Sequence, residues 1–263
     1  MKRGKWLKLL TAGMMICAIA AITGCGTNNE SEPKKTAEAQ AVLKIGTNPT
    51  YVPLEYTDEN GNYKGFELDI AQAVAKELGM KPEIKSIKFD GLIPALQTDQ
   101  IDMIASGMVM TEERQKKISF VPFFESGLSI MVNKNDDTIH SIADLKGKRI
   151  AVQMASTGAD VAHTIEGAAV RDFDHTPEAL LELKQGGADA VILGTIVAKY
   201  YLATTKDSDA KMVEEPVRTQ IIGLGIKKEN TELKAKVEQA LQKLKDSGEY
   251  QKLHDKYFKE AQN

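Results

Sequence analysis

The sequence is poor in the residues and motifs that carry most catalytic chemistry. It has two cysteines and four histidines, and His140, His163, His175 and His254 lack the spacing of metal ligands. It also has no GxxxxGK[ST] phosphate loop, no GxGxxG dinucleotide motif and no GxSxG nucleophile elbow. The sequence therefore lacks the usual motifs of hydrolases and of nucleotide-binding enzymes, and we expect neither a metal nor a cofactor.

The N-terminus has the pattern of a secretory signal. A basic head that contains four Lys and Arg residues precedes the apolar run LLTAGMMICAIAAI. This pattern predicts a signal peptide over residues 1–24. The alternative is an N-terminal transmembrane anchor, for which the run is short and ends abruptly.

The end of the apolar run, ITGC, resembles the lipobox of bacterial lipoproteins. The resemblance implies that Cys25 becomes the lipidated first residue of the mature chain, which would then be anchored to the extracytoplasmic side of the cell membrane. Cys17 lies in the removed segment, so the mature chain would have no internal disulfide. Residues 25–41 are polar, contain proline and show no apolar period, which predicts a flexible tether.

The charge balance argues against nucleic acid as a partner. The whole chain has 34 basic and 37 acidic residues, and residues 1–24 contain four basic and no acidic ones. The mature chain then has 34 − 4 = 30 cations against 37 acids, a net charge of −7. A net acidic protein repels the phosphate backbone.

Strands and helices alternate from Val42 onward. The stretches VLKIGTN and MIASGM are short and apolar, which is typical of buried parallel strands. In FELDIAQAVAKELG, apolar side chains recur at helical spacing at Phe66, Ile70, Val74 and Leu78. The sequence therefore predicts an α/β fold.

A second α/β series follows Asn133, and two series are too many for one small sheet. We therefore predict two lobes, one of residues 42–127 and 222–263 and the other of residues 128–221. ESGLSIMVN (125–133) and TQIIGLGIKK (219–228) are candidate crossing strands, which would form a hinge. The second series has predicted helices at 141–147, 156–165, 176–186 and 195–205, and predicted strands at 148–153, 169–174 and 188–194; a helical tail at 231–258 is interrupted by DSGEY.

Side chains suited to binding lie at strand ends and helix starts, where α/β folds place their ligands. Arg114 lies in the first turn of a short helix that Thr111 can cap, where the helix dipole opposes a cation. An anionic partner would explain it, and the alternative is a surface ion pair with Glu113 or another surface acid. Tyr51 and Phe89 suit a ligand wall and a core equally well.

Several stretches resemble the type II solute-binding proteins of polar amino-acid ABC transporters. They are YVPLEYTDENGNYKGFELDIAQAVAKELG, FDGLIPALQTDQIDMIASGMVMTEERQKKISF and LKGKRIAVQMASTGAD, with weaker support from ADAVILG and GEYQKLHDKYF. The resemblance covers residues 42–260. It implies a two-lobe, periplasmic-binding-protein-like type II fold with two crossing hinge strands.

The resemblance also implies a ligand site between the lobes. Arg114 would bind a ligand carboxylate bidentately, assisted by backbone N–H groups near Val109 and Thr157. Tyr51 and Phe89 would enclose the ligand side chain. The implied ligand-binding residues are Asn48, Tyr51, Phe89, Ser106, Gly107, Val109, Arg114, Gln153, Ser156, Thr157 and Gly194.

Two positions depart from the family pattern. Val109 replaces the usual Ser or Thr, and Gly194 replaces the usual Asp, and these two family residues ordinarily hold the ligand α-ammonium. A buried ammonium without a carboxylate loses about 2 to 5 kcal/mol. Either another acid, such as Glu55 or Asp160, or water takes this part, or the amino group of the ligand is absent, modified or placed differently.

Three functions from different classes follow from these features. The first is a monomeric binding lipoprotein that delivers a polar amino acid, or a carboxylate-bearing derivative, to an ABC permease and is not an enzyme. The second is an enzyme like cyclohexadienyl dehydratase, which shares the architecture and needs a carboxylic acid in the pocket. The third is a ligand sensor, which is disfavoured because no transmitting segment follows Asn263.

Overall fold

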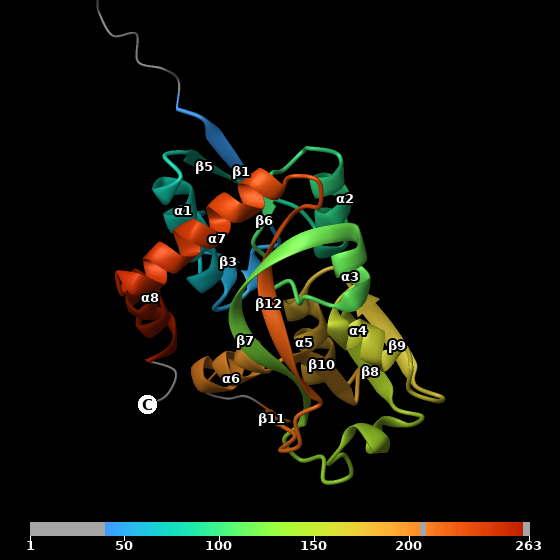
Figure 1. The fold of residues 1–263 in the computed structure, drawn as a ribbon. Helices are drawn as coiled ribbons and strands as arrows, with labels where there is room; N and C mark the ends of the chain where they lie inside the picture. Colours follow the sequence, from blue (N-terminus) through green and yellow to red (C-terminus); the bar gives the residue numbers. More distant parts are fainter. Residues whose placement is uncertain (1–39, 206–208, 260–263) are drawn as a thin grey trace, which may run out of the picture. The chain divides into compact units, whose positions relative to one another are not determined.

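The computed structural model describes residues 40–205 and 209–259 (Figure 1). The predicted signal peptide, Cys25 and most of the predicted tether lie outside the described residues. Within the described residues, no helix has the length and apolar character that a membrane span requires.

The fold is mixed α/β, as predicted, and is organised around a nine-stranded sheet. Its strand order is β5-β1-β6-β12-β7-β10-β8-β9, and β11 pairs with β7. A small three-stranded sheet of β2, β3 and β4 was not predicted. The strands are β1 (Val42–Thr47), β2 (Thr50–Tyr51), β3 (Glu55–Thr57), β4 (Tyr63–Lys64), β5 (Lys81–Ser86), β6 (Met103–Ile104), β7 (Ile118–Asn133), β8 (Arg149–Gln153), β9 (Ala169–Phe173), β10 (Ala190–Gly194), β11 (Ala210–Met212) and β12 (Arg218–Lys227).

The helices agree with the predicted alternation, apart from one segment. The predicted helix at 141–147 is only a 3-10 turn at Ile142–Leu145, which Ser141 and Asp144 close by reciprocal side-chain hydrogen bonds. The tail divides as predicted at DSGEY. The helices are α1 (Phe66–Glu77), α2 (Leu92–Gln97), α3 (Glu112–Lys117), α4 (Thr157–Ala162), α5 (Thr176–Lys184), α6 (Thr195–Thr204), α7 (Thr231–Asp246) and α8 (Glu249–Phe258).

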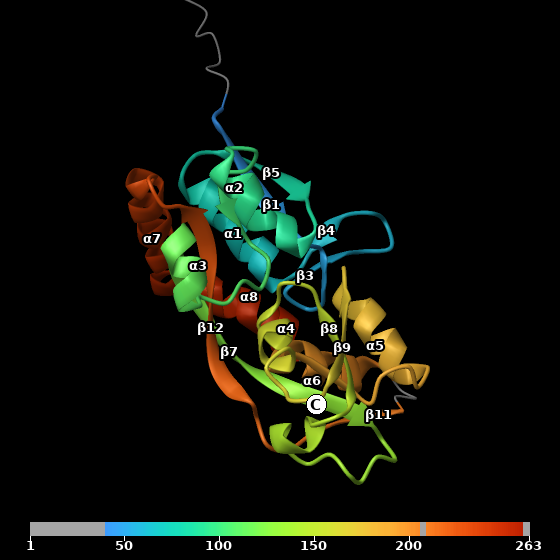
Figure 2. The same ribbon diagram turned by 90° about the vertical axis from the view of Figure 1, so that its right-hand side faces the viewer.

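The predicted crossing strands β7 and β12 join two sets of parallel strands. β1 pairs in parallel with β5 and β6, and β8 pairs in parallel with β9 and β10. β7 and β12 run antiparallel to each other between these sets, side by side in both ribbon views (Figures 1 and 2). The expectation that the two α/β series are too many for one sheet is therefore wrong. The long strand β7 pairs with β12 on one side and with β10 on the other, so both series belong to a single hydrogen-bonded sheet.

Separate hydrophobic clusters lie on the two sides of the crossing. In β7, Val121 and Phe123 belong to a cluster with α1, α7 and α8, whereas Leu128, Ile130 and Val132 belong to another cluster with β8 and α4. The two halves of β7 therefore pack into different hydrophobic clusters. The segment between Phe123 and Leu128 connects these clusters.

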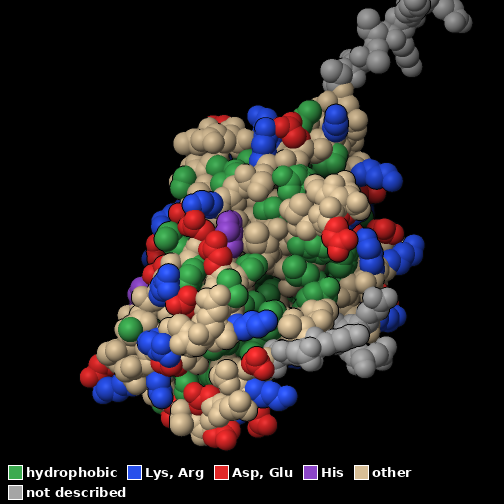
Figure 3. Space-filling view, turned by 180° about the vertical axis from the view of Figure 1, so that it is seen from behind, with side chains coloured by type: hydrophobic (Ala, Val, Ile, Leu, Met, Phe, Trp, Pro, Cys, Tyr) green, Lys and Arg blue, Asp and Glu red, His purple; other side chains and the backbone are tan. Residues whose placement is uncertain are grey.

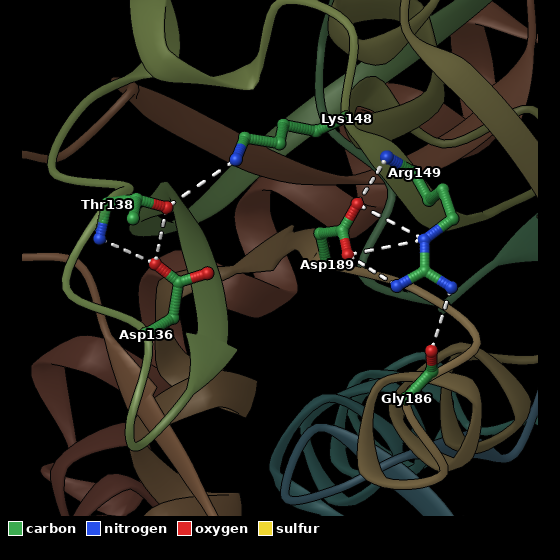
Figure 4. Close-up of polar contacts among 6 residues, drawn as sticks. All are labelled: Asp136, Thr138, Lys148, Arg149, Gly186 and Asp189. Atoms are coloured by element: carbon green, nitrogen blue, oxygen red, sulfur yellow. Dashed lines mark hydrogen bonds and ion pairs between the residues drawn. The ribbon is translucent and has the colours of Figure 1, made fainter.

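Polar contacts hold the amino ends of β8 and β10 (Figure 4). The backbone N–H of Arg149 donates to Asp189 at 2.8 Å, and the guanidinium of Arg149 donates to both Asp189 and the Gly186 carbonyl. Nearby, Asp136 accepts from the Thr138 N–H at 2.7 Å. These contacts fix one end of the parallel strands and leave their carboxyl ends to face the cavity described next.

Candidate ligand-binding site

One cavity brings together all the residues that the family resemblance implied. It lies at the carboxyl ends of both sets of parallel strands, where α/β folds place ligands. Asn48 follows β1, Gln153 ends β8 and Gly194 ends β10. The cavity is lined by Asn48, Tyr51, Glu55, Phe89, Ser106, Gly107, Val109, Arg114, Ser126, Gly127, Gln153, Ser156, Thr157, Gly194, Ile196, Gln220 and Ile222.

Arg114 is the buried cation of this cavity. Its side chain is only 8% exposed, and its guanidinium donates to the Val109 carbonyl at 2.9 Å and to the Ala155 carbonyl at 2.8 Å. The guanidinium carbon also lies 5.4 Å from the centre of the Phe89 ring. These contacts use neutral groups, so they orient the guanidinium without neutralising its charge.

The surface ion pair that the sequence left open for Arg114 does not form. Glu113 instead contacts Lys117 at 2.7 Å, and Arg114 makes no ion pair with any described carboxylate. Burial lowers the pKa of Arg114, while the charges of Asp160 and Glu113 act at longer range to raise it. An unpaired buried cation is costly, which favours an anion at this position.

Helix α3 is too short for the strong dipole effect that the sequence suggested at Arg114. Thr111 caps the helix as predicted, because its hydroxyl accepts from the Arg114 N–H at 3.2 Å. The helix has only six residues, however, and Arg114 also belongs to its last turn. The opposing dipole that the sequence suggested is therefore weak, and burial rather than the dipole distinguishes this arginine.

The remaining polar walls form a connected network. The Gln153 amide donates to Asn48 Oδ1 at 3.2 Å, and the Asn48 N–H donates to the Ser106 hydroxyl at 2.8 Å. His175 lies 3.1 Å from the Asn48 amide nitrogen, and Thr176 donates to Gln153. His175 and Thr176 had no predicted role here; their position at the start of α5, opposite the end of β1, is visible only in the folded chain.

The structure shows what occupies the two departures from the family pattern. The Gly194 N–H donates to the Tyr51 hydroxyl at 2.9 Å, and a Cβ atom on Gly194 would lie 2.3 Å from that oxygen. The Val109 side chain packs against the core, and its carbonyl is occupied by Arg114. Neither position offers a side-chain group for an ammonium.

Of the two acids that the sequence offered as substitutes, only Glu55 lines the cavity. The residue is 1% exposed, and within the part of the chain that the structure describes its Oε2 atom has no hydrogen-bond partner. Asp160 lines a different pocket, on the outer side of Arg114. The carboxyl group of Glu67 lies close to Glu55 and accepts from the Gly107 N–H at 2.6 Å.

Glu55 and Glu67 form a buried pair that resists ionisation. Burial raises the pKa of Glu55 well above its usual value; the charge of Glu67 adds to this, and a hydrogen bond with Ser106 opposes it. Burial also raises the pKa of Glu67 to about 8, against hydrogen bonds from the Gly107 and Ser106 backbone. Two carboxylates in one dry site cannot both be charged, so the pair retains at least one proton at neutral pH.

Five lining residues were missed by sequence reasoning: Ser126, Gly127, Ile196, Gln220 and Ile222. Four of them lie on β7 and β12. These four residues could have been suspected from the predicted crossing strands, because strands that connect two lobes run past a site that lies between the lobes. Which residues of a crossing strand face the cavity depends on its register, which the sequence does not show.

The cavity is enclosed and has a volume of about 30 Å³, room for a few water molecules. A larger groove of about 320 Å³ has walls that include Val52, Pro177, Leu180 and Tyr201. Its exposed surface is mostly apolar, with Thr50, Lys184 and Thr204 among the polar residues that line it, and it does not contain the buried arginine of the smaller cavity. The face seen in Figure 3 has charges of both signs around a hollow where hydrophobic side chains gather. Size alone therefore does not identify the polar ligand site.

The fold and the cavity together define an α/β binding protein of the type II periplasmic-binding-protein class. Residues 43–260 match the bacterial extracellular solute-binding proteins, family 3, and the chain belongs to this family. The predicted family and fold are confirmed. Among the described residues, no group of three or more His, Cys, Asp or Glu side chains is placed to hold a metal ion.

Named relatives cover nearly the whole chain. The arginine-binding extracellular protein ArtP of Bacillus subtilis (strain 168) is 33% identical over 97% of this chain and 98% of its own. The L-cystine-binding protein TcyJ of Escherichia coli (strain K12) is 28% identical over 93% of this chain and 94% of its own. Both relatives are named as binding proteins.

Solved structures give the same class. An ancestral arginine-binding protein bound to arginine has a TM-score of 0.79 and 41% identity, covering 83% of this chain and 99% of its own. The ancestral amino acid-binding protein AncCDT-1, a precursor of cyclohexadienyl dehydratase, has a TM-score of 0.78 and 38% identity, covering 83% of this chain and 96% of its own.

Proposed function

We propose that this protein is the substrate-binding lipoprotein of an ABC importer and captures an amino acid, or a carboxylate-bearing derivative of one, in the cavity at Arg114. The observation that carries this proposal is the burial of Arg114 without an ion pair among the described residues. A bidentate carboxylate satisfies a planar guanidinium in both charge and shape.

The relatives support an amino acid as the ligand class. ArtP is named for arginine and TcyJ for L-cystine, and an ancestral arginine-binding protein was solved both with arginine and with glutamine. The groups that would face the ligand side chain here, Asn48 and Gln153, are neutral and hydrogen-bond to each other. They suit a polar side chain better than an apolar one.

Capture requires that the cavity open and close. We assign residues 42–127 and 222–263 to one lobe and 128–221 to the other, with β7 and β12 as the hinge. Contacts between the lobes then hold the closed form, among them Tyr51 with Gly194, Arg114 with Ala155, and Lys88 with Asp174. An amino acid is larger than the present cavity, so it enters only when these contacts separate.

The proposal extends to anchoring and delivery. A lipidated Cys25 and the tether to residue 41 hold the protein on the extracytoplasmic face of the membrane, and the closed, loaded form is a monomer that docks on a permease. The ITGC motif and the transporter family support this assignment. Neither a cofactor nor nucleic acid has a part in it.

A ligand screen tests the proposal. Thermal unfolding of the full chain is measured with amino acids, N-modified amino acids, opines and small carboxylates. A true ligand at a hundredfold excess over Kd stabilises the fold by about 2.7 kcal/mol. Arg114→Lys should remove the stabilisation by the same compound, whereas a panel with no stabilising compound would reject the proposal.

One observation supports the alternative function, an enzyme like cyclohexadienyl dehydratase. Glu55 is a cavity carboxyl group that burial keeps protonated, as a general acid requires. Incubation with prephenate or arogenate separates the two functions. Turnover that Glu55→Gln abolishes would establish the enzyme, and binding without turnover would exclude it.

A further inference from the structure

The cavity contains one buried cation and one buried carboxyl group that its own contacts leave incompletely satisfied. On one side, Arg114 has only neutral partners. On the other, Glu55 Oε2 is buried and has no hydrogen-bond partner among the described residues, as is also true of Oε1 of the neighbouring Glu67, which does not line the cavity. A zwitterion presents the complement of this pair, a carboxylate and an ammonium group.

We propose that Glu55 receives the cationic amino group of the ligand, in place of an acid at position 194. This inference rests on the proposed function as an amino-acid-binding protein. It assigns to this chain an ammonium site on β3 in place of the usual position at the end of β10.

The position of Glu55 carries the inference. Among the described acidic residues, Glu55 alone lines the cavity that contains Arg114. Its Oε1 atom would lie 3.4 Å from a Cβ atom on Gly107, and the Tyr51 ring would lie 3.0 Å from the same Cβ. Glu55, Tyr51 and Gly107 therefore share one wall, and the Tyr51 hydroxyl continues that wall to Gly194.

Glycine at 107 and 194 lets the Tyr51 side chain lie directly against the backbone at both positions. Gly107 has a φ of 57°, which favours glycine, so no side chain shields Glu55 there. Gly194 likewise contributes only its backbone N–H to the Tyr51 contact. No side chain at position 107 therefore stands between the Glu55 carboxyl group and the cavity that both residues line.

Glu55 can accept a cation only by giving up its proton. The titratable or charged groups that surround it are Glu67 from α1, Tyr51 from β2 and, across the cavity, Arg114 from α3. The nearest of these, Glu67, disfavours a second negative charge, so the ligand-free pair retains a proton. The ammonium supplies the missing counter-charge, and the displaced proton leaves to solvent as Glu55 becomes the carboxylate.

The proposal makes binding of a free amino group proton-coupled. Binding of L-arginine or L-glutamine should release up to one proton at neutral pH, and affinity should rise with pH until Glu55 is ionised without ligand. The corresponding Nα-acetyl compounds carry no α-ammonium and should release none. This dependence separates a contact to the ligand from a purely structural role.

The test is calorimetry of the full chain in buffers of different ionisation enthalpy, with L-arginine, L-glutamine and their Nα-acetyl derivatives as probes. We expect Glu55→Gln to bind the free amino acids about 100-fold more weakly, to abolish proton release and to leave the acetylated probes unaffected. The matched control is Glu67→Gln, which removes the neighbouring carboxyl group outside the cavity lining. It should preserve the preference for a free amino group.

The outcomes separate this inference from the proposed function. If the wild type binds a free amino acid tightly without proton release, or Glu55→Gln binds it equally well, Glu55 is not the ammonium site while the binding function stands. If the wild type binds none of the four probes and no compound of the wider screen, both fail. Should Glu55→Gln not fold, proton release by the wild type decides alone.

Discussion

The backbone N–H of Gly194 donates a 2.9 Å hydrogen bond to the hydroxyl of Tyr51, although the two residues are 143 positions apart in the sequence. This contact joins the end of β10 to β2 across the cavity. The family resemblance implies an aspartate at position 194. In this chain the residue is glycine, and the Tyr51 hydroxyl lies directly against its backbone.

The first prediction concerns Gly194. Reversing both departures from the family pattern, Gly194→Asp with Val109→Thr, can have two outcomes: a restored ammonium site that tightens amino-acid binding, or harm to a ligand without an α-ammonium. Because a Cβ on Gly194 would lie 2.3 Å from the Tyr51 hydroxyl, we expect loss of binding. Strain of about 1 to 3 kcal/mol in the closed form corresponds to about a 5- to 150-fold increase in Kd, measured by calorimetry.

Gly194→Ala is the matched control, because it introduces the Cβ without the charge. Equal losses for Ala and Asp would identify the steric conflict with Tyr51 as the cause. Tighter amino-acid binding by the Asp variant alone would show that Tyr51 moves aside and that the usual ammonium position can be rebuilt.

The second prediction concerns Arg114. Arg114→Lys should weaken ligand binding about 100-fold, because an ammonium cannot hold a carboxylate bidentately. It should also cost about 1 kcal/mol of stability, since one of the carbonyl contacts to Val109 and Ala155 is lost. Calorimetry and denaturant unfolding measure the two effects.

Arg149→Lys is the control for that experiment. Arg149 also donates to a carbonyl and to a carboxylate, but it is exposed and lies at the amino end of β8 (Figure 4). Its replacement should leave the affinity unchanged. Equal affinity of wild type and Arg114→Lys would instead assign Arg114 a purely structural role.

The third prediction concerns pH. The pKa of Glu67 is raised from 4.5 to about 8 and that of Glu55 is raised in the same direction, so between these values the folded state binds more protons than the unfolded state. The contribution of Glu67 to stability is complete below about pH 4.5 and is lost as the pH rises to about 8, and the raised pKa of Glu55 acts in the same direction. The Tm of the ligand-free protein should therefore fall as the pH rises from 4.5 to about 8.

Variants of the carboxyl pair check that explanation. Glu67→Gln should flatten the fall of Tm with pH. Glu113→Gln should not change it, because Glu113 pairs with Lys117 at the surface and its pKa is lowered, below this range. A slope that Glu67→Gln leaves intact would mean that other groups cause the pH dependence.

The fourth prediction concerns the anchor. Cys25→Ser removes the thiol that the ITGC motif marks for lipidation, so the protein should no longer incorporate labelled fatty acid and should leave the membrane fraction. Cys17→Ser, inside the predicted signal peptide, should remain anchored. A Cys25→Ser protein that stays on the membrane after signal cleavage would contradict the lipoprotein assignment.

Local sequence determined the order of elements in this protein. Apolar stretches of strand length, the helical spacing through Phe66, Ile70, Val74 and Leu78, and the break at DSGEY all predict elements that the structure contains. These features could be predicted because each depends on neighbours a few residues away. The 3-10 turn at Ile142–Leu145 shows the limit, since four residues capped at once do not extend into a helix.

The sequence also marked Arg114 and the other implied site residues, and the structure brings them to one cavity. Only the tertiary structure decided how they are arranged there. Burial of Arg114 without a counter-ion, closure of Tyr51 on Gly194 and the enclosure of Glu55 beside Glu67 join elements far apart in the chain. Charge compensation depends on distances through space, and those are set by the register of the crossing strands and the packing of two cores.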